Sequence, residues 1–174
     1  MLRIAVTGPE STGKSTLSED LAKELKTVWV PEFAREYIEM LRHPYTQEDV
    51  EKIAHGQMKS EEEKLHTANN YLICDTELTV IKIWMEHKYG TCPNWIKEHI
   101  TNKPYDLYLL CDIDIPWTPD PQREHPESRE HFFLLFLNEL KLENKNYVII
   151  HGDRKQRLQT ALNAIEELSK NIIG

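Results

Sequence analysis

Five short runs of apolar and β-branched residues recur along the chain, separated by longer stretches in which apolar residues repeat with helical spacing. The short runs, which predict strands, cover residues 2–7, 27–30, 71–74, 106–111 and 147–151. The periodic stretches, which predict helices, cover residues 15–26, 33–41, 47–66, 77–87, 130–142 and 154–170. Because strands alternate with helices, the pattern predicts an α/β fold, in which helices cover both faces of a parallel sheet.

The predicted strands end in polar or charged residues. The sequences at these ends are VTG, VPEFARE, LICDTE, LLCDIDIPW and IIHGD. In open α/β sheets, ligands bind outside the carboxyl ends of the strands. We therefore expect these five strand ends to meet at one ligand-binding crevice.

The first of these strand ends carries a phosphate-binding motif. Residues 8–15, GPESTGKS, match GxxxxGK[ST] between a predicted strand and a predicted helix, which is the context that the motif requires. Gly8 and Gly13 permit backbone angles that direct successive N–H groups at a phosphate, and the helix adds its positive N-terminal end. The predicted nucleotide-binding residues are Gly8, Glu10, Ser11, Thr12, Gly13, Lys14, Ser15 and Thr16.

Three side chains of this motif predict specific contacts with a nucleotide. Lys14 is expected to bridge the β- and γ-phosphates, Ser15 to hold Mg²⁺, and Thr16 to donate to the α-phosphate. The alternative is a glycine-rich turn with a surface lysine. The surrounding strand and helix favour nucleotide binding over that alternative.

Asp75 ends the third predicted strand and is a candidate for the metal side of the site. An apolar strand that ends in an acid is the pattern that holds Mg²⁺, usually through water, beside a phosphate loop. The alternative is that Asp75 caps the helix predicted to begin at Glu77.

Glu32 and Arg35 follow the second predicted strand, in PEFAREY. A carboxylate here can accept the proton of an acceptor hydroxyl, and a guanidinium can orient the acceptor. The alternative is an exposed ion pair on one face of a helix.

Residues 112–130, here called the lid segment, follow the fourth predicted strand and contain four prolines that exclude a regular helix. Arg123 and Arg129 place two positive charges on this segment. A closing lid of this kind supplies arginines to a transferring phosphoryl group and excludes water. Trp117 is suited to stack on a flat or cationic ring. The alternative for the segment is a proline-rich surface loop with solvated arginines, and the alternative for Trp117 is that it only anchors the loop in the core.

Composition narrows the class of protein. The 174 residues fit a single domain, 1–174, with 40% hydrophobic and 29% charged residues. A net charge of −8 and a pI near 5.5 argue against nucleic-acid binding. The longest apolar run, 132–137, is too short to cross a membrane, and the first residues lack the plan of a signal peptide, so we expect a cytoplasmic protein without a membrane partner. Three scattered cysteines predict no structural metal site.

The motifs together resemble a known family. The sequences GPESTGKSTL, PEFAREY, CDT, KIW and PWTPDPQRE are similar to the ribosylnicotinamide kinase domain of bacterial NadR-type proteins, over nearly the whole chain. The resemblance implies a P-loop kinase fold with a parallel sheet in the order 2-3-1-4-5. It also implies transfer of the γ-phosphate of ATP to the 5′-hydroxyl of nicotinamide riboside, which gives nicotinamide mononucleotide.

The resemblance assigns roles by position in this sequence. Lys14 and Ser15 are implied to bind ATP and Mg²⁺, and Asp75 to support the metal or to activate the hydroxyl. The implied acceptor-side residues are Glu32, Arg35, Tyr37, Trp117 and Asp120, with Arg123 reaching the transferred phosphate. A riboside that carries a permanent positive charge suits an aromatic face and nearby carboxylates.

The chain also departs from the family pattern. Asp75-Thr76-Glu77 stands where DTD is common, and Pro121 stands near a position where glycine is common. The adenylyltransferase domain of full-length NadR proteins is absent from the sequence, so we expect a reaction that stops at the mononucleotide.

Two other functions stay open: a kinase of another nucleoside or nucleotide, and a non-catalytic ATP-binding sensor. The sequence also leaves open whether Glu32 or Asp75 is the base, and it makes no prediction of oligomeric state.

Overall fold

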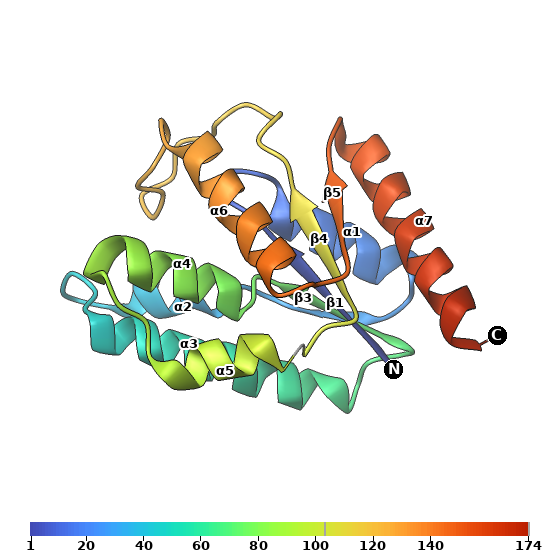
Figure 1. Cartoon of the computed structure of the whole chain (residues 1–174), viewed down its shortest axis with the longest axis horizontal. Helices are drawn as coiled ribbons and strands as arrows, with labels where there is room; N and C mark the ends of the chain where they lie inside the picture. Colours follow the sequence, from blue (N-terminus) through green and yellow to red (C-terminus); the bar gives the residue numbers. More distant parts are fainter. Residues whose placement is uncertain (103, 174) are drawn as a thin grey trace.

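A parallel sheet forms the centre of the protein. The computed structural model describes residues 1–102 and 104–173, and its five-stranded sheet has the order β2-β3-β1-β4-β5 (Figure 1). All pairings between neighbouring strands are parallel. The strands are β1 (Leu2–Thr7), β2 (Val28–Val30), β3 (Tyr71–Asp75), β4 (Leu107–Cys111) and β5 (Tyr147–Ile150). The predicted α/β P-loop fold and strand order are confirmed.

The helices follow the periodic stretches with one addition. They are α1 (Lys14–Glu24), α2 (Phe33–Met40), α3 (Gln47–Leu65), α4 (Leu78–Tyr89), α5 (Asn94–Thr101), α6 (Arg129–Leu142) and α7 (Arg154–Ile173). The sequence reasoning missed α5, which has only eight residues and begins after Pro93. Its tertiary contact stabilises it, because Ile96 and Ile100 lie one turn apart and are both buried. The last two residues of the lid segment belong to α6.

Each face of the sheet has its own apolar core. On one face, Leu17 and Leu21 of α1 and Ile165 of α7 pack against alternate residues of the central strands. On the other face, Ile83 of α4 and Phe136 of α6 do the same. A third apolar cluster joins α2, α3, α4 and α5. Both faces of the sheet are therefore covered, which explains why the strands are almost continuously apolar.

The layers place the loops at the carboxyl ends of the strands side by side. The loop after β1, the N-terminus of α2 and the lid segment that follows β4 all lie at this end of the sheet (Figure 1). Among the described residues, no helix is both long enough and apolar enough to cross a membrane.

Candidate functional site

The phosphate-binding motif forms a tight loop between β1 and α1. Gly8 has a φ of 130°, and a Cβ atom there would lie 2.9 Å from the carbonyl oxygen of Cys111 in the neighbouring strand. Gly13 has a φ of 77° and is the N-cap residue of α1. Both positions therefore require glycine, and together they direct the loop backbone toward the N-terminus of α1.

The Lys14 side chain folds back over this loop. Its Nζ donates to the carbonyl oxygens of Gly8 at 3.0 Å and Pro9 at 2.8 Å. The Thr12 hydroxyl also donates to the Pro9 carbonyl, at 2.8 Å. The loop carbonyls thus hold the Lys14 ammonium group inside the loop, where the motif predicts that phosphates bind.

Asp75 lies at the end of β3, with only 1% of its surface exposed. Burial raises the pKa of its carboxyl to about 6, and the charge of nearby Glu32 acts in the same direction. Lys14 and the Ser15 hydroxyl lower the pKa by smaller amounts. Its Oδ1 has no hydrogen-bond partner among the described residues. An unpartnered buried carboxylate oxygen beside Lys14 and Ser15 is a polar group that a ligand can satisfy.

Glu77, and not Asp75, caps the helix that follows. The Glu77 carboxylate accepts the backbone N–H of Thr79 at 2.7 Å and the hydroxyl of Thr7 at 2.9 Å. Its burial raises its pKa to about 7. Between the two acids, Thr76 has a φ of 74°, a strained conformation for a β-branched residue. The alternative role of Asp75 as an N-cap is therefore wrong, and the turn at Thr76 leaves its Oδ1 without a partner among the described residues.

The residues at this end fit a magnesium ion. Ser15 supplies a hydroxyl and Asp75 a carboxylate, which are oxygen ligands of the kind that Mg²⁺ prefers. Within the described parts of the chain, no group of three or more His, Cys, Asp or Glu residues is placed to hold a metal by itself. Magnesium here would therefore depend on phosphate oxygens and water for its remaining ligands, as is usual for this ion.

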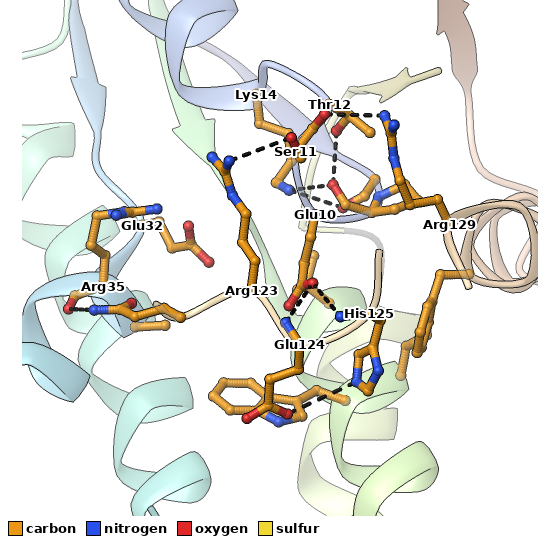
Figure 2. A pocket seen from close by; sticks show the side chains of 18 of the residues that line it. Glu10, Ser11, Thr12, Lys14, Glu32, Arg35, Arg123, Glu124, His125 and Arg129 are labelled. Carbon is orange, nitrogen blue, oxygen red and sulfur yellow. Dashed lines mark hydrogen bonds and ion pairs between the residues drawn. The ribbon is translucent and has the colours of Figure 1, made fainter. Parts of the chain in front are cut away.

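A cavity of about 500 Å³ connects the phosphate loop with α2, α4 and the lid segment. All eight residues of the motif line it, together with Thr16. Glu32 and Arg35 of the α2 region line the same cavity, as does Arg123 of the lid segment (Figure 2). The structure therefore brings together residues that the sequence places more than a hundred positions apart.

The α2 region is tied to the lid segment by polar contacts. The Arg35 guanidinium lies 3.1 Å from the Asp120 carboxylate, and the Gln122 side chain donates to the Arg35 carbonyl at 3.2 Å. The pKa of Asp120 is lowered by the backbone N–H of Gln122 and by Arg35. Arg35 thus pairs with the lid segment and not with a neighbouring residue of its own helix.

The end of the cavity away from the phosphate loop has an aromatic wall, formed by Tyr45 and Trp84. Their ring centroids are 4.9 Å apart at 73°. The Tyr45 hydroxyl accepts from the Trp84 indole at 3.1 Å and also from Lys88, and it donates to the Glu124 carboxylate at 3.0 Å. Val80, Ile83 and Phe132 add apolar surface to the lining. The two rings are therefore nearly perpendicular. The Lys88 Nζ lies 3.7 Å from the centroid of the Tyr45 ring, and Glu124 adds a charge of the opposite sign beside it.

The lid segment contacts the phosphate loop through several groups. Arg123 donates to the Ser11 hydroxyl at 3.4 Å, and Arg129 donates to the Ser11 carbonyl at 3.1 Å. The Glu10 carboxylate accepts two backbone N–H groups of the lid segment, from Glu124 and His125 (Figure 2). Both predicted lid arginines therefore reach the phosphate loop.

Two predicted acceptor-side residues lie elsewhere. Tyr37 donates to Asp49 at 2.9 Å and joins α2 to α3. Trp117 is partly buried, and the guanidinium carbon of Arg129 lies 5.9 Å from its ring centroid. Neither residue is among the described residues that line the cavity, and Asp120 meets the site through its pair with Arg35.

The sequence reasoning missed several residues of the site. Those of the aromatic wall and its rim are Tyr45, Trp84, His87, Lys88, Glu124 and His125. A helical signal existed, because Trp84 and Lys88 lie one turn apart on α4, but their spacing alone does not show which side of the helix faces a cavity. Arg157 of α7 supports the phosphate loop from behind, since it donates to the Thr12 carbonyl at 2.9 Å.

Comparison with known proteins identifies related chains. A family described as "AAA domain" matches residues 3–157. The Trifunctional NAD biosynthesis/regulator protein NadR of Salmonella typhimurium is 26% identical over 174 residues, which cover 95% of this chain and 42% of that protein. The Escherichia coli protein of the same name is 26% identical over 158 residues, covering 86% of this chain and 38% of that one. This chain therefore spans less than half the length of these relatives.

Solved structures show the same fold. A NadR protein in complex with NR matches with a TM-score of 0.79 at 23% identity, over 96% of this chain and 50% of that one. Thymidylate kinase from Ehrlichia chaffeensis matches with a TM-score of 0.65 at 13% identity, over 92% of this chain and 96% of that one. The predicted resemblance to NadR-type proteins is confirmed, and the fold is that of P-loop kinases.

Proposed function

The chain belongs to the AAA domain family, and we propose that this member transfers the γ-phosphate of ATP to the 5′-hydroxyl of nicotinamide riboside. The observation that carries the proposal is the shared cavity, which has a phosphate loop at one end, Glu32 and Arg35 at its side and an aromatic wall at the other end. The names of its relatives support the substrate, since they concern NAD biosynthesis and a complex with NR.

Phosphoryl transfer needs positive charge around the γ-phosphate more than it needs covalent chemistry. In the proposed reaction, Lys14 leaves its carbonyl partners and contacts the phosphates, while the N–H groups of the loop and the start of α1 bind the remaining oxygens. Arg123 contributes a second cation from the lid segment. Magnesium bound through Ser15, with support from Asp75, would neutralise further phosphate charge.

We assign the proton acceptor to Glu32. It lines the cavity, at the N-terminus of α2, whereas Asp75 is almost fully buried beside Lys14 and Ser15. A base must reach the hydroxyl that it activates, so position favours Glu32 over Asp75. Arg35, held by Asp120, is then placed to orient the ribose.

The acceptor ring is assigned to the wall formed by Tyr45 and Trp84. A pyridinium ring carries a positive charge, which the π-face of Trp84 favours. The Tyr45 ring already has the Lys88 ammonium 3.7 Å from its centroid, so Tyr45 contributes the edge of the wall and not the stacking face. Glu124 lies at the rim of the same wall and adds a carboxylate. Trp117, which the sequence suggested for stacking, is not among the described residues that line the cavity.

The test is a coupled assay of ADP release with Mg-ATP, comparing nicotinamide riboside, a panel of ordinary nucleosides and no acceptor. Strong stimulation by nicotinamide riboside alone is the expected result. Stimulation by another nucleoside would retain phosphoryl transfer and reject the substrate. Tight ATP binding without stimulation by any acceptor would favour a nucleotide sensor instead.

A further inference from the structure

Glu10 occupies a position of the phosphate motif for which the motif itself requires no particular side chain. Its carboxylate points toward the lid segment (Figure 2). The Oε2 atom accepts the backbone N–H of Glu124 at 3.1 Å and that of His125 at 3.2 Å. Hydrogen bonds to a carboxylate are stronger than those between neutral groups. One side chain of the loop therefore holds two consecutive peptide groups of the lid segment.

The part of the lid segment that Glu10 holds carries three cavity side chains. Arg123, Glu124 and His125 all line the cavity. Arg123 reaches back to Ser11 of the phosphate loop. Glu124 extends toward the aromatic wall, where it accepts the Tyr45 hydroxyl and lies 3.7 Å from Lys88. The same short stretch thus contacts both ends of the cavity.

We propose that Glu10 is a positioning residue that closes the lid segment over both ends of the cavity at once. Binding of its carboxylate to the two N–H groups sets Arg123 at the phosphate end and Glu124 at the acceptor wall. The inference goes beyond the role in nucleotide binding expected for Glu10 from the motif. It rests on the proposed function only for its kinetic consequence.

The kinetic consequence is the share of ATP that is hydrolysed by water in place of being used to phosphorylate the acceptor. In transfer, the bond between the γ-phosphorus and its bridging oxygen to ADP breaks, a bond forms to the acceptor hydroxyl oxygen, and the hydroxyl proton passes to Glu32. In hydrolysis, a water oxygen takes the place of the acceptor oxygen, and the products are ADP and inorganic phosphate. A closed lid excludes that water, so loss of the Glu10 contacts increases the hydrolytic share of turnover.

Hydrogen–deuterium exchange tests the contact itself. In Glu10→Ala, we expect the amides of Glu124 and His125 to exchange about tenfold faster than in the wild type, because their shared acceptor is lost. Glu10→Gln retains a carbonyl oxygen without the charge, and an intermediate rate is expected. Glu19→Ala removes an exposed carboxylate from the adjoining helix and serves as the matched control, with wild-type rates. If the alanine variant fails to fold, the glutamine variant still carries the test.

A second measurement separates positioning from nucleotide binding. The Kd of ATP and the ratio of phosphorylated nicotinamide riboside to total ADP are measured for the same variants. We expect Glu10→Ala to lower that ratio several-fold, with a smaller change in the Kd, and Glu10→Gln to restore part of it. Unchanged lid exchange in Glu10→Ala would overturn the proposal, whether or not the Kd rises.

The two proposals fail in different ways. If no nucleoside stimulates the wild type, the proposed function fails, while the exchange experiment still decides the role of Glu10. If the wild type phosphorylates nicotinamide riboside and Glu10→Ala leaves both exchange and product ratio unchanged, only the inference about Glu10 fails.

Discussion

The two ends of the cavity are built in different ways. Apart from Arg123, the phosphate end comes from one continuous segment, residues 8–16, whose conformation depends on two glycines and on the start of α1. The acceptor end is assembled from α2, the loop before α3, one side of α4 and the lid segment. The phosphate end can be identified from a short sequence motif, whereas the acceptor end depends on how separate elements pack. The ends should therefore respond differently to mutation.

The largest effect is expected at the phosphate end. Lys14→Ala removes the cation that the loop places at its centre, and we expect kcat for ADP release to fall about 1,000-fold or more. The acceptor end should stay intact, because the aromatic wall lies on other elements. Lys59→Ala, on the exposed side of α3, is the matched control and should behave as the wild type. Near-normal turnover of Lys14→Ala would reject the phosphate-loop assignment.

A second large effect is expected at Asp75, where turnover and stability should change in opposite directions. Asp75→Asn should lower kcat about 100-fold or more while ATP still binds. Its folded pKa is raised from 3.8 to about 6, so the ionised form destabilises the fold, and stability is lost as pH rises through that range. The variant should therefore have a higher Tm than the wild type at pH 8, as measured by calorimetry.

The same pKa predicts a pH profile. The Asp75 carboxyl of the free protein takes up its proton as pH falls through about 6, so the wild-type kcat/KM for Mg-ATP should decline on that acidic side. Asp75→Asn has no such group, and its residual activity should lack this limb. A lower Tm for the variant at pH 8, or an unchanged acidic limb, would contradict the assigned state of Asp75.

An intermediate effect should distinguish two tryptophans at the acceptor end. Trp84→Ala should raise the KM for nicotinamide riboside about tenfold or more and leave the KM for ATP within about twofold, since only the ring wall is lost. Trp84→Phe retains an aromatic face and should recover much of the affinity. Trp117→Ala is the decisive comparison. If this variant has a higher KM for nicotinamide riboside than Trp84→Ala, the acceptor ring binds at the lid segment and not at the aromatic wall.

The smallest expected effect concerns the strained turn that carries Asp75. Thr76 has a φ of 74°, which glycine adopts without strain and alanine does not. Thr76→Gly should therefore be more stable than Thr76→Ala by about 1 kcal/mol in urea unfolding. Equal stabilities would show that the turn does not store strain. A modest loss of kcat in Thr76→Gly would indicate that the rigid turn also positions Asp75.

The sequence alone determined the fold class, the strand order implied by the resemblance, and the phosphate loop. The fold class and the phosphate loop depend on local patterns: apolar runs of strand length, helical periodicity and a glycine spacing that suits only a few backbone shapes. The strand order came from the family resemblance and not from these patterns. The one missed helix, α5, is too short to be stable without Ile96 and Ile100 packed in the core.

Only the tertiary structure decided the composition of the acceptor end. Tyr45, Trp84 and Glu124 come from three elements and meet through a single phenol hydroxyl, and no spacing along the chain indicates that contact. Tyr37 and Trp117 are of the same chemical types, yet one joins α2 to α3 and the other lies against Arg129. Residue type shows which chemistry a side chain can perform. Packing of the helices on the sheet determines which of these side chains face the cavity.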